Sequence, residues 1–337
     1  MMTQMPGTVP RLALVDLARG LALVAMGVFH LAWDLSHLGF ITTDVAQHPG
    51  WRLFSQAIAA TFLALAGVSL ALAHAHGVRA AAFWRRVALV AGAAALVTAG
   101  TWLLMPQAPI FFGILHCIAA GAILALPFVR VRWWLTVLAG VLVLAMPLVL
   151  SLPAVDAWQV AMESSRLNGL WQHLGLTSDG PVAVDFVPLV PWFGIMLGGV
   201  AAGSWLVTRG PVEALATMRV PPAGQALVWA GRRSLPIYLL HQPVLLGSLM
   251  LLALLAPGLT ITPAQRAEAG FARDCVAQCR VSRSAETCGQ ACGCVLDELR
   301  QDPALLAQAL GLQAATPGTD AAIQTRAAMC FARSDRR

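Results

Sequence analysis

Long apolar segments separated by short polar ones make up most of the chain. A membrane-spanning helix needs about 20 consecutive, mainly apolar residues, and every apolar segment of this length lies before residue 258. The segments are 12–33, 53–74, 83–105, 110–128, 133–152, 187–207 and 234–256. The pattern predicts an all-α protein, a polytopic transmembrane helix bundle of about seven spans.

The arginines between these segments orient the predicted bundle. Ten of them fall on the side of the N-terminus, whereas only Arg52 and Arg166 fall in the opposite loops. Basic residues are retained on the cytoplasmic side, so we expect the N-terminus inside and, after an odd number of spans, the C-terminus outside. The net charge of +6 resides largely in such loop arginines, and we expect no nucleic-acid partner.

A different kind of sequence begins near residue 259. Residues 1–258 are read as the transmembrane domain and 259–337 as a small extracytoplasmic tail, which holds six of the seven cysteines. They are Cys275, Cys279, Cys288, Cys292, Cys294 and Cys330. So many cysteines in a short segment are typical of an oxidising compartment. They predict disulfide-stapled helices exposed to the periplasm of a bacterium, with the protein in its inner membrane.

The cysteine spacing suggests a pairing but does not fix it. Cys275 and Cys279 are four positions apart, and so are Cys288 and Cys292. This spacing places the two cysteines of each pair on one face of a helix. Two antiparallel helices could then form two disulfides, with Cys294 bonded to Cys330. The alternative is a zinc site built from Cys288, Cys292 and Cys294. The C-x2-C spacing of most zinc sites is missing, so no metal is expected.

Polar residues within the first apolar segment are the main candidates for chemistry. In VDLARGLALVAMGVFHLAWDL, residues 15–35, a rotation of about 100° per residue places Asp16, Arg19, His30, Trp33 and Asp34 in one sector of roughly 100°. Ionisable residues inside a membrane normally face the bundle interior and are functional; the alternative is an Arg–Asp pair that only locks helices together. Asp34 follows His30 by one turn and could orient its imidazole.

Later segments supply further polar groups. His116 in FFGILHC, with Asp185 and Trp192 in DFVPLVPWFG, is expected at the same outer end as His30 and Asp34. His241 in SLPIYLLHQP enters from the inner side and is expected nearer Arg19, and Arg232 and Arg233 precede it. The long loop 153–186 either covers a site or is an ordinary surface loop.

These blocks carry a family resemblance. The spacing of Arg19 and His30 resembles the first-helix motif of membrane acyltransferases of type 3. Taken together, VDLARGLALVAM, HLAWD, FFGILHCIA, DFVPLVPWFG and WAGRRSLPIYLLHQP resemble the bacterial proteins of the heparan-α-glucosaminide N-acetyltransferase catalytic-domain family, over about residues 11–250. The segment from His30 to Asp34 is also similar to the His-x-x-Trp-Asn segment of the eukaryotic enzymes, which place their histidine after an intervening loop.

The resemblance implies transfer of an acetyl group from cytosolic acetyl-CoA to an amine or hydroxyl, usually on a sugar, across the membrane. It implies that His30 carries the chemistry. We expect Asp34 to orient His30, His116 or Trp192 to stabilise the oxyanion, and Arg19, Arg232 and Arg233 to hold anionic parts of CoA. Asp16, Trp33, Asp185 and His241 complete the expected binding site. Expected partners are membrane lipid, the CoA thioester and a glycan or other small acceptor; an oligomer is possible.

Two other functions are compatible with the same residues. The first is a proton-coupled transporter that uses the stripe of Asp16, Arg19, His30 and Asp34 as a relay. Against it, the two halves of the chain show no matching pair of interrupted helices. The second is a structural anchor that displays the cysteine-rich tail, which leaves the polar stripe unexplained.

Overall fold

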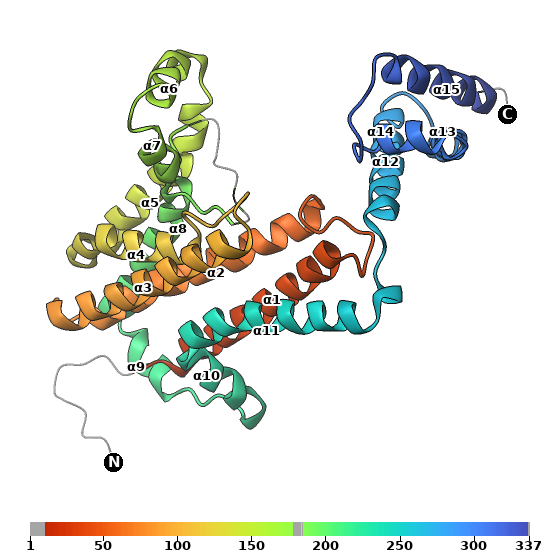
Figure 1. Cartoon of the computed structure of the whole chain (residues 1–337). Helices are drawn as coiled ribbons and strands as arrows, with labels where there is room; N and C mark the ends of the chain where they lie inside the picture. The colour runs from red at the N-terminus through yellow and green to blue at the C-terminus, as the bar shows by residue number, and fades with distance from the viewer. Residues whose placement is uncertain (1–10, 178–182, 184, 336–337) are drawn as a thin grey trace. The chain divides into compact units, whose positions relative to one another are not determined.

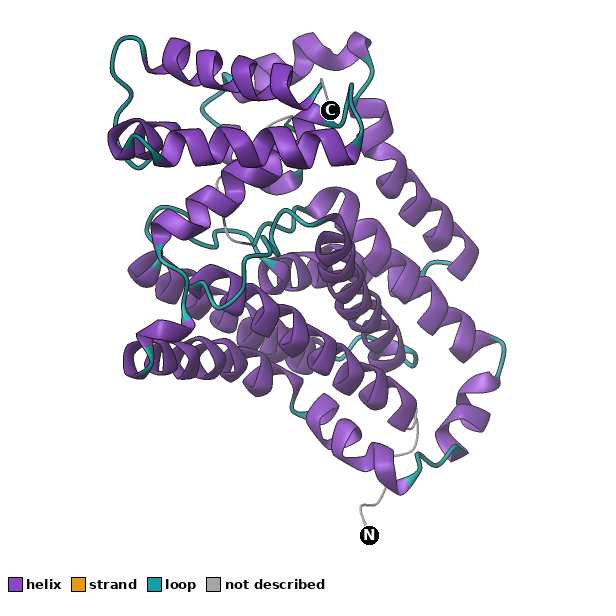
Figure 2. Cartoon of the chain, turned by 90° about the vertical axis from the view of Figure 1, so that its right-hand side faces the viewer, coloured by secondary structure: helices purple, strands orange, loops and turns teal. Residues whose placement is uncertain are grey.

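The computed structural model describes residues 11–177, 183 and 185–335, and every regular element in these ranges is helical (Figure 2). Six helices are long and apolar enough to cross a membrane: α1 (Ala13–Leu38), α2 (Pro49–His74), α3 (Ala80–Leu104), α5 (Trp133–Leu150), α8 (Leu189–Thr208) and α11 (Ser234–Leu255) (Figure 1). The expected span 110–128 corresponds to a shorter apolar segment, α4 (Ile114–Ala125) continued by the 3₁₀ turn η1 (Leu126–Arg130). The all-helical membrane fold is thus confirmed.

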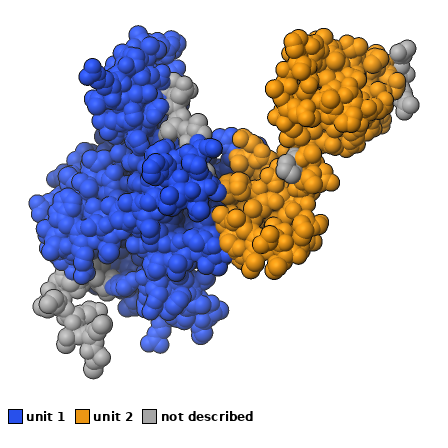
Figure 3. Space-filling view, in the orientation of Figure 1, with its two compact units in different colours: residues 1–30, 49–244 blue, residues 31–48, 245–337 orange. Residues whose placement is uncertain are grey.

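The chain divides into two compact units, which are described separately (Figure 3). The first unit takes in residues 1–30 and 49–244, and the second takes in 31–48 and 245–337. Helices α1 and α11 each contribute to both units. The division at residue 258 stays a prediction about domains, since it was drawn from composition.

Helix α8 is the centre of the first unit and packs against α2, α4 and α5. Glycines make the closest approach possible: a Cβ on Gly199 would overlap the Ala64 carbonyl of α2, and one on Gly67 would overlap the Met196 carbonyl of α8. Small residues at such positions let helices in a membrane gain dispersion contacts, because the hydrophobic effect supplies little attraction there. Leu63, Leu197 and Val200 are fully buried around this contact.

Shorter helices complete the first unit. The loop 153–186 contains η2 (Pro153–Val155), α6 (Asp156–Glu163) and α7 (Asn168–Leu174), and α7 packs against the start of α8. Helix α9 (Pro211–Thr217), the turn η3 (Pro222–Gly224) and α10 (Gln225–Arg232) lie between α8 and α11. Helix α10 approaches α1 closely, and two glycines permit this approach. A Cβ on Gly231 would overlap the Asp16 carbonyl, and one on Gly20 would overlap the Leu227 carbonyl. This contact holds Arg232 beside the first helix.

The second unit contains η4 (Pro257–Leu259), α12 (Pro263–Cys279), α13 (Ala285–Arg300), α14 (Pro303–Ala309) and α15 (Thr319–Ser334). Side-chain caps begin three of these helices: Thr262 for α12, Ser284 for α13 and Asp302 for α14. A capping oxygen satisfies a backbone N–H that a helix start otherwise leaves without a partner. Val295, Leu299 and Leu305 form a small core.

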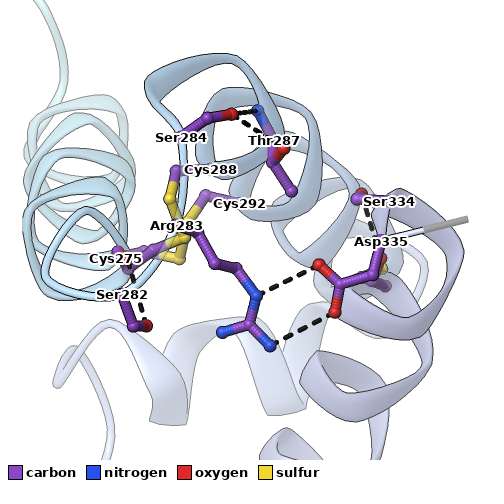
Figure 4. The surroundings of a disulfide bond; sticks show 11 residues. Cys275, Ser282, Arg283, Ser284, Thr287, Cys288, Cys292, Ser334 and Asp335 are labelled. Atoms are coloured by element: carbon purple, nitrogen blue, oxygen red, sulfur yellow. Dashed lines mark hydrogen bonds and ion pairs between the residues drawn. A yellow bond between two sulfur atoms is a disulfide. The ribbon is translucent and has the colours of Figure 1, made fainter. Parts of the chain in front are cut away.

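Three disulfides staple the tail in the arrangement expected for two antiparallel helices. Cys275 is bonded to Cys292, Cys279 to Cys288, and Cys294 to Cys330. Near them Arg283 donates to both carboxylate oxygens of Asp335, at 3.1 and 3.2 Å (Figure 4). The hydrogen bond and the charge of Asp335 raise the pKa of Arg283, so the guanidinium keeps its charge.

Candidate functional site

Asp16 is the centre of an ion-pair cluster at the N-terminal end of α1. Its side chain is almost fully buried and contacts three guanidinium groups. The nearest N···O distances are 2.9 Å to Arg11, 3.1 Å to Arg19 and 3.2 Å to Arg232. Arg19 also donates a hydrogen bond to Ser69 on α2. The cluster therefore joins α1, α2 and α10 and leaves two more positive charges than negative ones, since three arginines face one carboxylate.

His30 meets α11 about four turns further along α1. Its Nδ1 lies 2.7 Å from Oε1 of Gln242 and 2.9 Å from Nε2 of His241. The rings of His30 and His241 are 4.8 Å apart between centroids. The expected place of His241, nearer Arg19, is therefore corrected. Counting turns along α11 gave its depth but not how α11 crosses α1, and the crossing decides which residues meet.

The contacts of His241 fix the protonation of both rings. Nδ1 of His241 lies 2.6 Å from the Tyr238 carbonyl, which can only accept, so Nδ1 carries the hydrogen. In neutral His241, Nε2 is then an acceptor and Nδ1 of His30 must be the donor. Donation to Gln242 Oε1 is consistent with this assignment. Neutral His30 consequently keeps the basic lone pair on Nε2.

His116 occupies a different part of the site. The Gly113 N–H donates to His116 Nδ1 at 3.3 Å, and Nε2 of His116 lies 3.2 Å from Oγ1 of Thr98. That hydroxyl donates to the Ile110 carbonyl, so it accepts from His116 Nε2–H. Both ring nitrogens of His116 are thus engaged at the start of α4. The N–H expected to stabilise the oxyanion is thus directed to Thr98 in this arrangement, and the oxyanion role of His116 stays a prediction.

Asp185 joins His116 at the start of α4. Its Oδ2 accepts a hydrogen bond from the Ile114 N–H at 3.4 Å. Desolvation raises the pKa of the Asp185 carboxyl, and the hydrogen bond from Ile114 lowers it in part. Asp185 also interacts electrostatically with Tyr238, whose ring lies 5.6 Å from that of His241. Tyr238, the chain's single tyrosine, is therefore close both to His241 of the histidine pair and to the Asp185 carboxyl.

Helix α7 covers the His116 end. The His173 ring makes an edge contact with Phe112 at 5.3 Å between centroids, and Phe112 lies 5.7 Å from the His116 ring. These contacts agree better with a loop 153–186 that covers a site than with an ordinary surface loop.

The other predicted residues lie as follows. Trp192 is half-buried and packs against the α2–α8 core. Arg233 lies over the Trp229 ring at 4.6 Å. Asp34 is fully buried, and Trp33 stacks on His37 at 4.7 Å, both in the second unit. That Asp34 orients His30 stays a prediction.

Sequence reasoning missed three residues of this site: Gln242, Tyr238 and Ser69. Gln242 directly follows His241 and Tyr238 precedes it by three residues. A polar residue beside an intramembrane histidine was therefore the available signal. Ser69 carried no such signal in an apolar helix.

Comparison with known proteins gives one positive result. Residues 11–243 match the family described as heparan-alpha-glucosaminide N-acetyltransferase, catalytic. No curated protein and no solved structure shows significant similarity to the chain. The matched range contains all of the candidate site residues outside the tail.

Proposed function

Because the chain belongs to the heparan-alpha-glucosaminide N-acetyltransferase catalytic family, we propose that it moves an acetyl group from cytosolic acetyl-CoA to an acceptor on the other side of the bacterial inner membrane. The acceptor is an amine or hydroxyl, with a sugar as the first choice. One observation supports this proposal above the others: Nδ1 of His30 is held by Gln242 and His241, which leaves Nε2 as the basic atom.

The chemistry needs a proton acceptor at the reacting nucleophile. As the acceptor's nitrogen or oxygen attacks the thioester carbonyl, its proton passes to Nε2 of His30. The new C–N or C–O bond forms, the C–S bond breaks, and the CoA thiolate takes up a proton. A positioned general base contributes about 10²–10⁴-fold to rate. If His30 instead carries the acetyl group, the same Nε2 atom attacks the thioester first.

His30 becomes positively charged in either route, and its surroundings accommodate that charge. Nδ1–H of His30 donates to the side-chain Oε1 of Gln242 and to the lone pair on Nε2 of His241. A hydrogen bond from a charged donor is roughly twice as strong as a neutral one. Both contacts therefore strengthen as the reaction proceeds, which is the condition for lowering the barrier.

The arginine cluster is the proposed contact for anionic parts of CoA. Arg11, Arg19 and Arg232 share the single carboxylate of Asp16, so their positive charge is only partly balanced. Arg suits phosphate because its planar guanidinium can donate two parallel hydrogen bonds. Arg233, held over Trp229, is a further candidate.

The proposal is tested with purified protein in nanodiscs, [¹⁴C]acetyl-CoA and a panel of amino sugars and neutral sugars. His30→Ala is expected to lower acetyl transfer by about 10²-fold or more with unchanged expression and thermal unfolding. The matched control is His76→Ala, because His76 is an exposed histidine of the same unit. Normal turnover by His30→Ala would refute the mechanism. Proton flux in liposomes without acetyl transfer would favour the transporter.

A further inference from the structure

A pocket separate from the His30 site lies between α2, α3 and α4. Its volume is about 140 Å³, and most of its lining residues are apolar. They include Leu70, Phe83, Val87, Val90, Ile118 and Ala122. An apolar cavity of about 150 Å³ accommodates benzene, so this pocket has room for a short length of one slender chain.

His74 supplies an unsatisfied polar atom to this pocket. The residue is 8% exposed, and its Nδ1 lies 2.9 Å from the Leu70 carbonyl, so Nδ1 is the donor there. Its Nε2 is buried and has no hydrogen-bond partner among the described residues. A buried polar atom without a partner costs free energy. His74 lines the pocket, so a bound molecule can supply the missing hydrogen bond.

Positive charge lies beside the same pocket. Arg86 and Arg79 both line it. Arg79 donates to the Ala73 carbonyl at 3.1 Å, at the end of α2. Arg86 makes no hydrogen bond or ion pair with a described acidic residue, and it is close enough to Arg19 for mutual repulsion. Asp16, the carboxylate of the neighbouring cluster, already pairs with three other arginines.

We propose that this pocket binds an amphiphilic anion whose slender apolar chain enters between α2, α3 and α4 while its phosphate or carboxylate contacts Arg86 and His74. The apolar walls match the chain, the unpaired guanidinium matches the anion, and Nε2 of His74 supplies a directed hydrogen bond. The site does not depend on acetyl transfer. The same ligand chemistry occurs in a single-chain membrane phospholipid and in a free fatty acid.

Binding is measured on the full chain in nanodiscs of neutral lipid, with a diazirine-labelled monoacylglycerol phosphate as the probe. Arg86→Gln is expected to lower labelling affinity about tenfold or more, because it removes a charge-assisted contact. Arg85→Gln is the matched control, since Arg85 is the preceding exposed arginine and does not line the pocket. Ala122→Leu fills the pocket and is expected to abolish labelling, whereas Ala95→Leu, on an exposed face of α3, is not.

Competition experiments identify which kind of amphiphile occupies the pocket. Displacement of the probe by a free fatty acid supports the site with a carboxylate as its anion. Displacement by unlabelled monoacylglycerol phosphate alone supports it with a single-chain phospholipid. Equal labelling of Arg86→Gln, Arg85→Gln and the parent protein would overturn the proposal, as would full competition by a neutral alcohol of the same chain length. A failure of acetyl transfer affects none of these readouts.

Discussion

His241 offers the most informative test of the proposed reaction, because its proposed role acts through His30 and has a measurable signature of its own. His241→Phe keeps an aromatic ring of similar size and removes both ring nitrogens. The variant loses the acceptor 2.9 Å from Nδ1 of His30 and the donor 2.6 Å from the Tyr238 carbonyl. Gln242 still accepts from His30, so orientation is weakened and not lost.

The expected fall in kcat follows from the single hydrogen bond between Nδ1 of His30 and Nε2 of His241. A hydrogen bond to a charged group contributes about 1.5–3 kcal/mol, and His30 is charged only as the reaction proceeds. The expected fall in kcat is therefore about 10- to 150-fold, at about 1.4 kcal/mol per factor of ten. KM should change little, because the contact strengthens after substrate has bound. His241→Gln retains an acceptor and is expected to recover much of the loss.

Two assays check this expectation. Steady-state acetyl transfer in nanodiscs gives kcat and KM, and ¹⁵N NMR of labelled histidine reports which nitrogen of His30 carries the hydrogen. The parent protein should show His30 protonated at Nδ1, and His241→Phe should show a larger share protonated at Nε2. If His241→Phe turns over at the parent rate with an unchanged His30 signal, the positioning role is wrong.

Two further expectations concern the stability of the two units. Gly199→Ala should strongly destabilise the first unit, because its Cβ would overlap the Ala64 carbonyl. Gly198→Ala is the control, since a Cβ there meets nothing within 4 Å and should be tolerated. Thermal unfolding in detergent compares the two variants, and equal stability would contradict the packing. Replacing Cys294 and Cys330 by Ser opens a 36-residue loop. By the chain-entropy relation, the free energy of unfolding of the tail should fall by about 4 kcal/mol. Amide hydrogen exchange of the full chain measures this loss, and unchanged protection would contradict it.

The helices were predictable because burial in lipid imposes strong local rules. A long apolar segment has to satisfy its own backbone hydrogen bonds, so it becomes a helix. The expected spans 133–152 and 234–256 agree with α5 and α11 within a few residues. The cysteine spacing suggested disulfides between two antiparallel helices but left the connectivity open, and the structure supplies it.

The partners of the polar residues were harder to predict, because they depend on how helices cross. Periodicity placed Arg19 and His30 on one face of α1, and the structure gives both of them contacts to other helices. It could not show that His30 meets His241, because depth along two helices leaves their crossing point open. His116 shows the same limit, since its partners Thr98 and Gly113 precede it on neighbouring segments.

The two ends of the polar face on α1 therefore do different things. At Asp16 the charges are paired with one another, and breaking a buried pair is costly, so that end fixes α1 to α2 and α10. At His30 the neighbours are neutral hydrogen-bonding groups that occupy Nδ1 and leave Nε2 basic. A residue that served only to join helices would gain nothing from keeping one nitrogen basic. The arrangement thus agrees with the proposed base at His30, while the Asp16 end joins the helices and its arginines keep surplus positive charge for the proposed contact with CoA.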